Sequence, residues 1–268
     1  MGVIHGDAFE NILGKDNEYS KILQNISNFE HIGDIIINGK NGHILQNDLQ
    51  EVNFRVIILY RENSYNLETF YPNFSNGSLV SIEILEIRED ENQVEAYIVG
   101  EILTNHEIKR KILFIATDYI LNKEKYFVGN KISISLSSTP VVLGIAKEYF
   151  EVNYNEEILN ALGIDIKYDK DGNIEPTKFY TNLLTYIMES DKTDVVYEFM
   201  ASIEEEENLK ISDIEIKKLL LSINLGGEDD NNIIKFPMYF NKEKYSEITL
   251  EKGVKIQGFL EFHGFLVK

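Results

Sequence analysis

The chain has 268 residues, with 45 Asp and Glu against 26 Lys and Arg, which gives a formal charge of −19. Its length suits one large domain or two small ones, and 43% hydrophobic residues suffice for a sizeable core. It has no cysteine, which excludes disulfides, cysteine-ligated metals and thiol catalysis. The acidic balance argues against unaided binding to nucleic acid or anionic lipid, because such binding requires cations that neutralise phosphates.

Targeting signals are not visible in the sequence. The N-terminus has no basic stretch followed by an apolar run, as a signal peptide would. Apolar runs such as 56–60 are far shorter than the ~18 residues that a membrane span needs. We therefore expect a cytoplasmic protein without a membrane segment.

The first two regions differ in their hydrophobic pattern. In residues 1–50, Asp16 is a candidate N-cap for a helix that continues to Ile26, and a hairpin is expected over 34–45. In residues 51–152 the apolar residues alternate, which is typical of antiparallel strands. Several strands at short spacing predict a curved sheet or a small barrel-like region. The expected strands are 53–61, 79–88, 93–103, 108–118, 131–137 and 141–152.

Residues 153–232 have a helical pattern and most of the charge. Residues 151–232 hold 20 acidic and 7 basic residues, a balance of −13, whereas residues 233–268 hold 4 and 6, a balance of +2. A capping-box spacing from Ser212 to Glu215 precedes an apolar stripe. Helices are expected over 156–162, 177–190, 193–205 and 212–223, and strands over 233–240 and 254–267.

The predicted fold class is therefore α+β. A mainly antiparallel curved sheet or small barrel-like β region is followed by an acidic helical region and a C-terminal β hairpin. The four regions 1–50, 51–152, 153–232 and 233–268 are separate units or parts of one compact body. No linker rich in proline or glycine separates them.

Motifs for nucleotide, calcium or serine chemistry are incomplete. In a calcium loop centred on Gly172, the first and twelfth positions would be Lys167 and Lys178, which repel the ion. A hairpin turning at Asp171 and Gly172 is the better interpretation. Gly33 to Lys40 has the wrong spacing for a phosphate loop, and no nucleophile elbow occurs.

Histidines and carboxylates offer two weak sites. His5 lies near Asp7 and His31 near Asp34, as a metal site or an acid–base pair requires, but such spacings are common. Asp165 and Lys167, with Glu156 or Glu157 on a preceding helix, have the spacing of a magnesium-dependent nuclease site, which also occurs by chance in a charged chain. We assign no catalytic residue, metal ligand or cofactor from these patterns.

Two features are candidates for contact with another protein. The segment 61–77 is expected to be a long loop whose aromatic residues are interface anchors or fold back onto the barrel: Tyr65, Phe70, Tyr71 and Phe74. Acidic clusters at helix ends and in a loop dock a basic surface or form a solvated face: Glu204, Glu205, Glu206, Glu207, Glu228, Asp229 and Asp230.

These observations favour a non-enzymatic intracellular binding or regulatory protein. One version is an acidic inhibitor that docks a basic protein surface, without direct contact to nucleic acid or membrane. A metal-dependent hydrolase or nuclease that uses scattered carboxylates is one alternative. A structural, self-assembling component is another.

Overall fold

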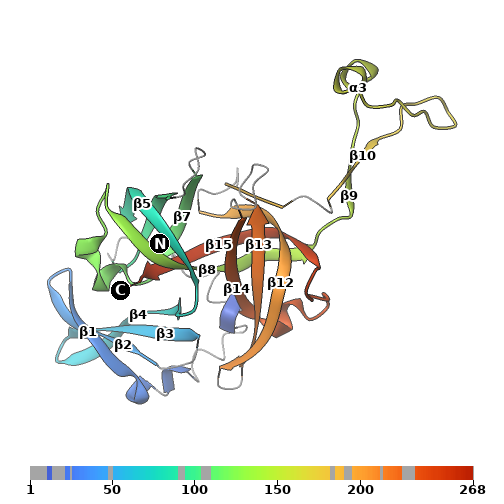
Figure 1. Ribbon diagram of the computed structural model, residues 1–268. Helices are drawn as coiled ribbons and strands as arrows, with labels where there is room; N and C mark the ends of the chain where they lie inside the picture. Colours follow the sequence, from blue (N-terminus) through green and yellow to red (C-terminus); the bar gives the residue numbers. More distant parts are fainter. Residues whose placement is uncertain are drawn as a thin grey trace.

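A computed structural model describes ten stretches of the chain, and they form a mainly β molecule (Figure 1). The described residues are 11–13, 22–24, 26–47, 51–89, 94–103, 110–181, 185–189, 195–211, 214–224 and 233–267. The predicted α+β class is wrong, because the region expected to be helical consists mainly of strands. In the part of the chain that the structure describes, no helix has the length and apolar character of a membrane span.

The first sheet is a four-stranded antiparallel meander. Its strands are β1 (Glu30–Ile37), β2 (Lys40–Gln46), β3 (Val52–Arg61) and β4 (Ser64–Phe74). Two-residue turns with positive φ, Asn38–Gly39 and Glu62–Asn63, join β1 to β2 and β3 to β4. The hairpin expected over 34–45 is confirmed. The loop expected over 61–77 is wrong, because a two-residue turn leaves the following residues free to pair as β4.

Among the described residues, the second sheet contains nine strands, eight of which close into two rings. The first ring consists of β5 (Ser78–Glu89), β6 (Ala96–Ile102), β7 (Arg110–Ala116), β8 (Lys131–Ile145) and β15 (Lys255–Leu266). The second ring consists of β12 (Tyr197–Ile211), β13 (Ile214–Asn224), β14 (Ile233–Asn241) and the same β8 and β15. A short strand, β11 (Tyr186–Glu189), pairs with the start of β12.

The pair β8–β15, the shared ladder, belongs to both rings. These strands pair antiparallel from Ile256↔Ile145 to Leu266↔Ile134. On its other edge, β8 pairs first with β5 and then, at Ser138, with β14. Likewise, β15 pairs first with β12 and then, at His263, with β7. Each strand of the ladder thus changes partner near its middle, and the change divides the sheet into two rings.

Two hydrophobic cores follow from this arrangement. The first fills the rings and includes Ile98, Phe114 and Phe262. The second lies between the four-stranded sheet and the far ends of β12 to β14, where Phe54 and Tyr71 share a cluster with Ile211, Ile214, Ile216 and Tyr239. The four-stranded sheet is therefore attached to the second ring by a continuous apolar interface.

The passage of β13 between these cores explains why residues 212–223 were expected to be a helix. Ile216 faces the second core, whereas Leu219, Leu221 and Ile223 face the first. Alternation in a strand puts positions 216 and 219 on opposite faces, and each face is buried in turn. The change of face produces the spacing i, i+3 that is typical of a helix. Ser212 lies outside the described residues, and Glu215 is in the strand.

Other boundaries also differ from the sequence-based expectations. The helices expected over 177–190 and 193–205 are wrong, because Thr177–Tyr180 and Tyr186–Glu189 are strands and β12 alternates regularly into the first core. The break expected between 137 and 141 is absent, since β8 runs through Pro140. The C-terminal strands are confirmed as β14 and β15. The hairpin expected between them is wrong, because β14 lies between β13 and β8, whereas β15 pairs with β8, β12 and β7. Asp16 lies outside the described residues, and Ile22 is in a helical stretch.

Helical elements are few among the described residues. The expected helix over 156–162 is confirmed as α3 (Glu156–Leu162), capped by the Asn155 side chain and ended by Gly163 in the left-handed region. Short 3₁₀ turns occupy η1 (Ile26–Asn28), η2 (Tyr119–Leu121), η3 (Lys123–Lys125) and η5 (Lys242–Tyr245).

Residues 149–181, the arm, project from the body of the molecule (Figure 1). A two-stranded ribbon of β9 (Tyr149–Val152) and β10 (Thr177–Tyr180) carries α3 and a small hairpin at its far end. The hairpin expected at Asp171 and Gly172 is confirmed by the Tyr168↔Ile174 bridge and the positive φ of Gly172. Because β8 ends at Ile145, the arm follows the shared ladder after three residues.

A glycine in the shared ladder tests how closely its strands approach. Gly258 has a φ of 156°, and a Cβ there would overlap the carbonyl oxygen of Val142. We expect Gly258→Ala to lower the free energy of unfolding by about 3 kcal/mol, because the backbone of β8 must move. Gly144→Ala on the facing strand is the matched control, since no atom lies within 4 Å of its added Cβ. Urea unfolding curves measure both, and equal effects would contradict the close approach.

Candidate functional site

The acidic run 204–207 lies in β12 and not at a helix end, which corrects its expected setting. Glu206 and Glu207 form ion pairs with Lys217 and Lys218 on the neighbouring strand β13. The Glu204 carboxylate accepts a 2.6 Å hydrogen bond from Ser222 and lies 3.9 Å from Lys235. Glu205 is exposed. Lysines on β13 and β14 thus balance much of the charge of this run. Glu228, Asp229 and Asp230 lie outside the described residues.

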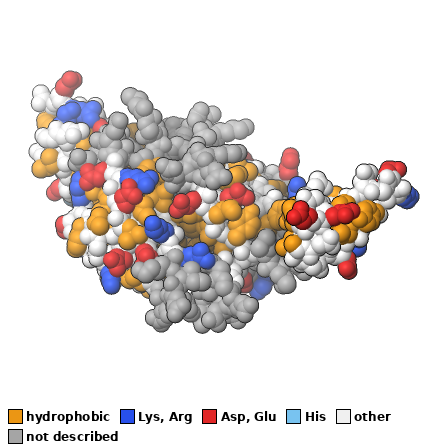
Figure 2. All heavy atoms as spheres, turned by 90° about the horizontal axis from the view of Figure 1, so that it is seen from above, with side chains coloured by type: hydrophobic (Ala, Val, Ile, Leu, Met, Phe, Trp, Pro, Cys, Tyr) orange, Lys and Arg blue, Asp and Glu red, His pale blue; other side chains and the backbone are white. Residues whose placement is uncertain are grey.

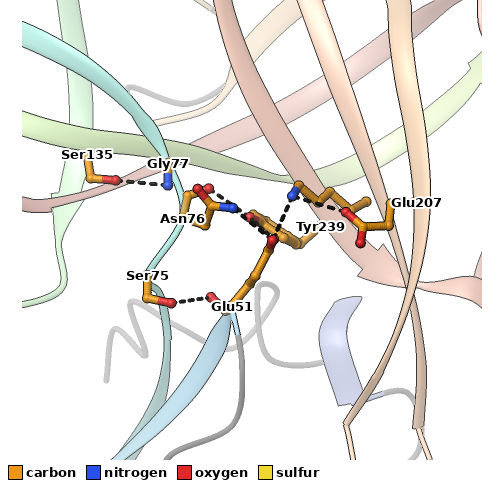
Figure 3. A network of polar contacts seen from close by, with 8 residues as sticks. Glu51, Ser75, Asn76, Gly77, Ser135, Glu207 and Tyr239 are labelled. Atoms are coloured by element: carbon orange, nitrogen blue, oxygen red, sulfur yellow. Dashed lines mark hydrogen bonds and ion pairs between the residues drawn. The ribbon is translucent and has the colours of Figure 1, made fainter.

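Lys218 also belongs to a polar network that joins the two sheets (Figure 3). Its Nζ lies 2.7 Å from the carboxylate of Glu51, which also accepts hydrogen bonds from Asn76 at 2.8 Å and from Tyr239 at 3.1 Å. The Tyr239 hydroxyl lies 2.8 Å from the carbonyl oxygen of Asn76. A hollow of about 280 Å³ beside this network is lined by Glu205, Glu206 and Glu207. The polar groups of the network bond to one another, so the network is a structural bridge between the two sheets.

Electrostatics at Glu51 follow from this network. Partial burial raises the pKa of Glu51, but the hydrogen bonds from Lys218 and Asn76 and the ammonium charge outweigh it and lower the pKa below its ordinary value. Burial and the neighbouring Glu51 raise the pKa of Tyr239. The Glu51 carboxylate is therefore ionised and accepts the hydrogen bond, and the Tyr239 phenol is neutral and donates it.

Three of the four aromatic candidates pack inside the molecule. Tyr71 and Phe74 are buried, and Phe74 stacks on Tyr239 with the ring centroids 5.1 Å apart. Phe70 is half-buried and stacks on Phe54. This arrangement corresponds to the alternative in which the rings fold back onto the chain, here between the two sheets. Tyr65 differs, because 55% of it is exposed.

Tyr65 contacts a cluster of two histidines and one carboxylate on the four-stranded sheet. Nε2 of His31 lies 2.8 Å from Oδ1 of Asp34, and Nδ1 of His43 lies 2.6 Å from the same oxygen. Nε2 of His43 is hydrogen-bonded to the Tyr65 hydroxyl at 2.9 Å. The hydrogen bonds from His43 and His31 hold the pKa of Asp34 below its ordinary value.

Strand register assembles this cluster, and the sequence contains part of the signal. The pair His31 and Asp34 is visible from its spacing, which a metal site or an acid–base pair requires, but no such role was assigned from it because the spacing is common. The turn at Asn38–Gly39 then places His43 directly opposite Asp34. Working out this register from the turn would have found His43. Tyr65 could not be found this way, because it lies on β4, across β3 from His43, and its place also depends on the register of β2 with β3, which no two-residue turn fixes.

The other candidate ligands do not converge in the described residues. His31, Asp34 and His43 form a group with metal-binding spacing, whereas Asp165 and Glu156 belong to no group of three such side chains among the residues that the structure describes. Asp165 and Lys167 are exposed on the arm. His263 is buried and hydrogen-bonded to Thr139 at 3.0 Å, and burial lowers its pKa to about 3. His5 and His106 lie outside the described residues.

The arm has an apolar surface that its own fold leaves exposed. Only Leu159 among its large apolar side chains is buried, while its exposed apolar residues are Ile158, Leu162, Tyr168, Phe179 and Tyr180. Figure 2 shows hydrophobic side chains between acidic ones on the projecting part. Residues 149–181 contain seven acidic and three basic residues, a balance of −4. The arm is therefore both apolar and acidic.

A groove of about 300 Å³ lies where the two rings meet, and we call it the β7–β11 groove. Its lining includes the apolar side chains Ile187, Met188 and Ile234, and two cations, Arg110 and Lys111. One carboxylate, that of Glu189, contributes to the same lining. The groove thus has an apolar surface with a basic side.

Comparisons with known proteins give no further guide: no family model, curated protein or solved structure matches this chain. Function has to be inferred from these surfaces.

The Glu51 network predicts a pH-dependent loss of stability. Because its folded-state pKa is below the ordinary value of 4.5, Glu51 stabilises the fold above that pH, and the effect disappears as the pH falls through the lowered value. We expect Glu51→Gln to cost about 1 to 2 kcal/mol at pH 7 and progressively less below pH 4.5. Urea unfolding at several pH values measures this, with exposed Glu205→Gln as control. A difference that does not depend on pH would contradict the role of the ionised carboxylate.

Proposed function

We propose that the protein is a non-enzymatic assembly component, in which the arm of one copy docks in the β7–β11 groove of a second copy. The single observation that carries this proposal is the projecting, apolar arm. Among the three functions that the sequence left open, it favours self-assembly. The proposal keeps the expected binding role and the expected contact between an acidic and a basic surface. It places the acidic surface on the arm instead of on residues 204–207.

An isolated two-stranded ribbon with one short helix buries little of its own apolar surface. In the arm, Ile158 and Leu162 lie one helical turn apart on the same exposed face of α3. Packing of these two side chains against another surface would remove them from water and contribute roughly 3 kcal/mol or more. A second chain is a reasonable source of that surface, because exposed apolar patches often mark protein interfaces.

The β7–β11 groove complements the arm in two respects. Its side chains Ile187 and Met188 offer apolar contact, and Arg110 and Lys111 offer positive charge near an arm whose balance is −4. The chain as a whole carries −19, so two copies repel each other unless opposite charges meet locally. A basic groove that receives an acidic arm brings opposite charges together and favours one relative orientation of the two copies.

Excision of the far part of the arm tests this function. Val152 and Thr177 are paired across the ribbon, so an Asn-Gly turn can replace residues 153–176 and close it. We expect light scattering to give the wild type at least twice the chain mass of 31.0 kDa and the excised variant the mass of one chain. A monomeric wild type, or an assembly that survives the excision, would contradict the proposal.

Point variants separate the apolar contact from a general effect on the arm. Ile158→Ser with Leu162→Ser should weaken association roughly 100-fold, in line with the loss of about 3 kcal/mol of burial. Asn160→Ser with Ala161→Ser changes exposed positions of the same helix and should leave association unchanged. Met188→Glu tests the groove, because a carboxylate there repels the acidic arm. If association persists in Met188→Glu, the groove is not the receptor.

A further inference from the structure

We propose that His31, Asp34 and His43 bind one divalent transition-metal ion, of which Zn²⁺ is the representative probe. One ligand atom from each of these side chains lies within 4.8 Å of the others. The site is on the four-stranded sheet, and the inference does not depend on the assembly role of the arm. It rests on the convergence of three ligand atoms.

The distances suit a shared ion. Metal–nitrogen and metal–oxygen bonds of about 2.0 to 2.2 Å place neighbouring ligand atoms roughly 3 to 3.4 Å apart. Here both imidazole nitrogens approach the same Asp34 oxygen, at 2.8 Å from His31 and 2.6 Å from His43. Small rotations of the exposed His31 and Asp34 side chains and of the half-buried His43 would open enough space for an ion. Binding would replace the two histidine–carboxylate hydrogen bonds with coordination bonds.

The backbone holds two of the three ligands in place. Asp34 and His43 are directly paired across the β1–β2 hairpin, so their Cα positions are fixed by the ladder. Next to His43, Gly42 allows β2 to approach β3, because a Cβ at Gly42 would contact the carbonyl oxygen of Ile58 at 2.5 Å. The hairpin therefore presents its ligands from a rigid support, which reduces the entropy cost of binding an ion.

Tyr65 is placed as a supporting partner of the site. Its hydroxyl lies 2.9 Å from Nε2 of His43, while Nδ1 of His43 faces Asp34. Histidines that ligate metals usually have their second nitrogen hydrogen-bonded in this way, which fixes the ring and the nitrogen that coordinates. The T-shaped contact between Tyr65 and Tyr60, with centroids 5.4 Å apart, restricts the phenol further.

The ligand set determines the class of ion. Two imidazoles with one carboxylate suit Zn²⁺ and other first-row transition ions, whereas Mg²⁺ and Ca²⁺ prefer oxygen ligands alone. Three protein ligands leave at least one coordination position for water. An open hollow of about 570 Å³ adjoins the site and is lined by Asp34, His43, Tyr60 and Tyr65, so water has access to the ion.

Calorimetric titration with Zn²⁺ tests the proposal on the full chain. We expect one ion per chain, binding more than about 100-fold weaker in His43→Gln and in Asp34→Asn, and 10- to 100-fold weaker in Tyr65→Phe. Co²⁺ provides a second readout, since its visible absorption spectrum reports nitrogen and oxygen ligation directly. Because these side chains are on the surface, circular dichroism should show that the variants remain folded.

Asp165→Asn is the matched control for Asp34→Asn, because Asp165 is an exposed carboxylate on the arm and belongs to no metal-binding group among the described residues. It should leave the affinity for Zn²⁺ unchanged. Absence of saturable binding to the wild type would overturn the proposal. Equal affinity in the wild type and all cluster variants would also overturn it, because surface carboxylates elsewhere would then account for the binding.

Discussion

The shared ladder β8–β15 is the interaction on which the rest of the structure depends. Each of its strands has two edges, and β8 and β15 pair with each other along one edge of each strand. The two remaining edges are divided between β5 and β7 of one ring and β12 and β14 of the other. Both rings therefore close on the same pair of strands, and their side chains form one core. Loss of the ladder would open both rings at once.

The ladder also determines where the candidate binding surfaces lie. Because β8 leads into the arm after Ile145, the arm projects from one end of the shared ladder. The β7–β11 groove lies at the junction that the ladder creates between the rings. The histidine cluster, by contrast, is on the separate four-stranded sheet, which the Glu51 network and the second core attach to the second ring. Assembly and metal binding are thus proposed for different parts of the molecule.

The sequence predicts local pairing better than it predicts which core a residue faces. The hairpin over 34–45, the helix ending at Gly163 and the strands 233–240 and 254–267 follow from turn residues and alternation, and the structure confirms them. The helical pattern at 216–223 was misleading because β13 buries opposite faces in two cores. At the histidine cluster, the spacing of His31 and Asp34 was visible, and His43 could be reached from the hairpin register. Tyr65 could not be reached in the same way, because it lies across β3 from His43 and depends on the register of β2 with β3, which no two-residue turn fixes.

Cross-linking between two different single-cysteine variants tests the central claim, that the arm of one copy docks in the β7–β11 groove of another. The chain has no cysteine, so Leu162→Cys in the arm and Met188→Cys in the groove can each be labelled alone. With a short bismaleimide, we expect the mixture of both variants to give a cross-linked dimer far faster than either variant alone. Leu79→Cys, exposed on β5, replaces the groove cysteine in the control. Equal cross-linking of Leu162→Cys to Leu79→Cys and to Met188→Cys, or none to either, would contradict the account.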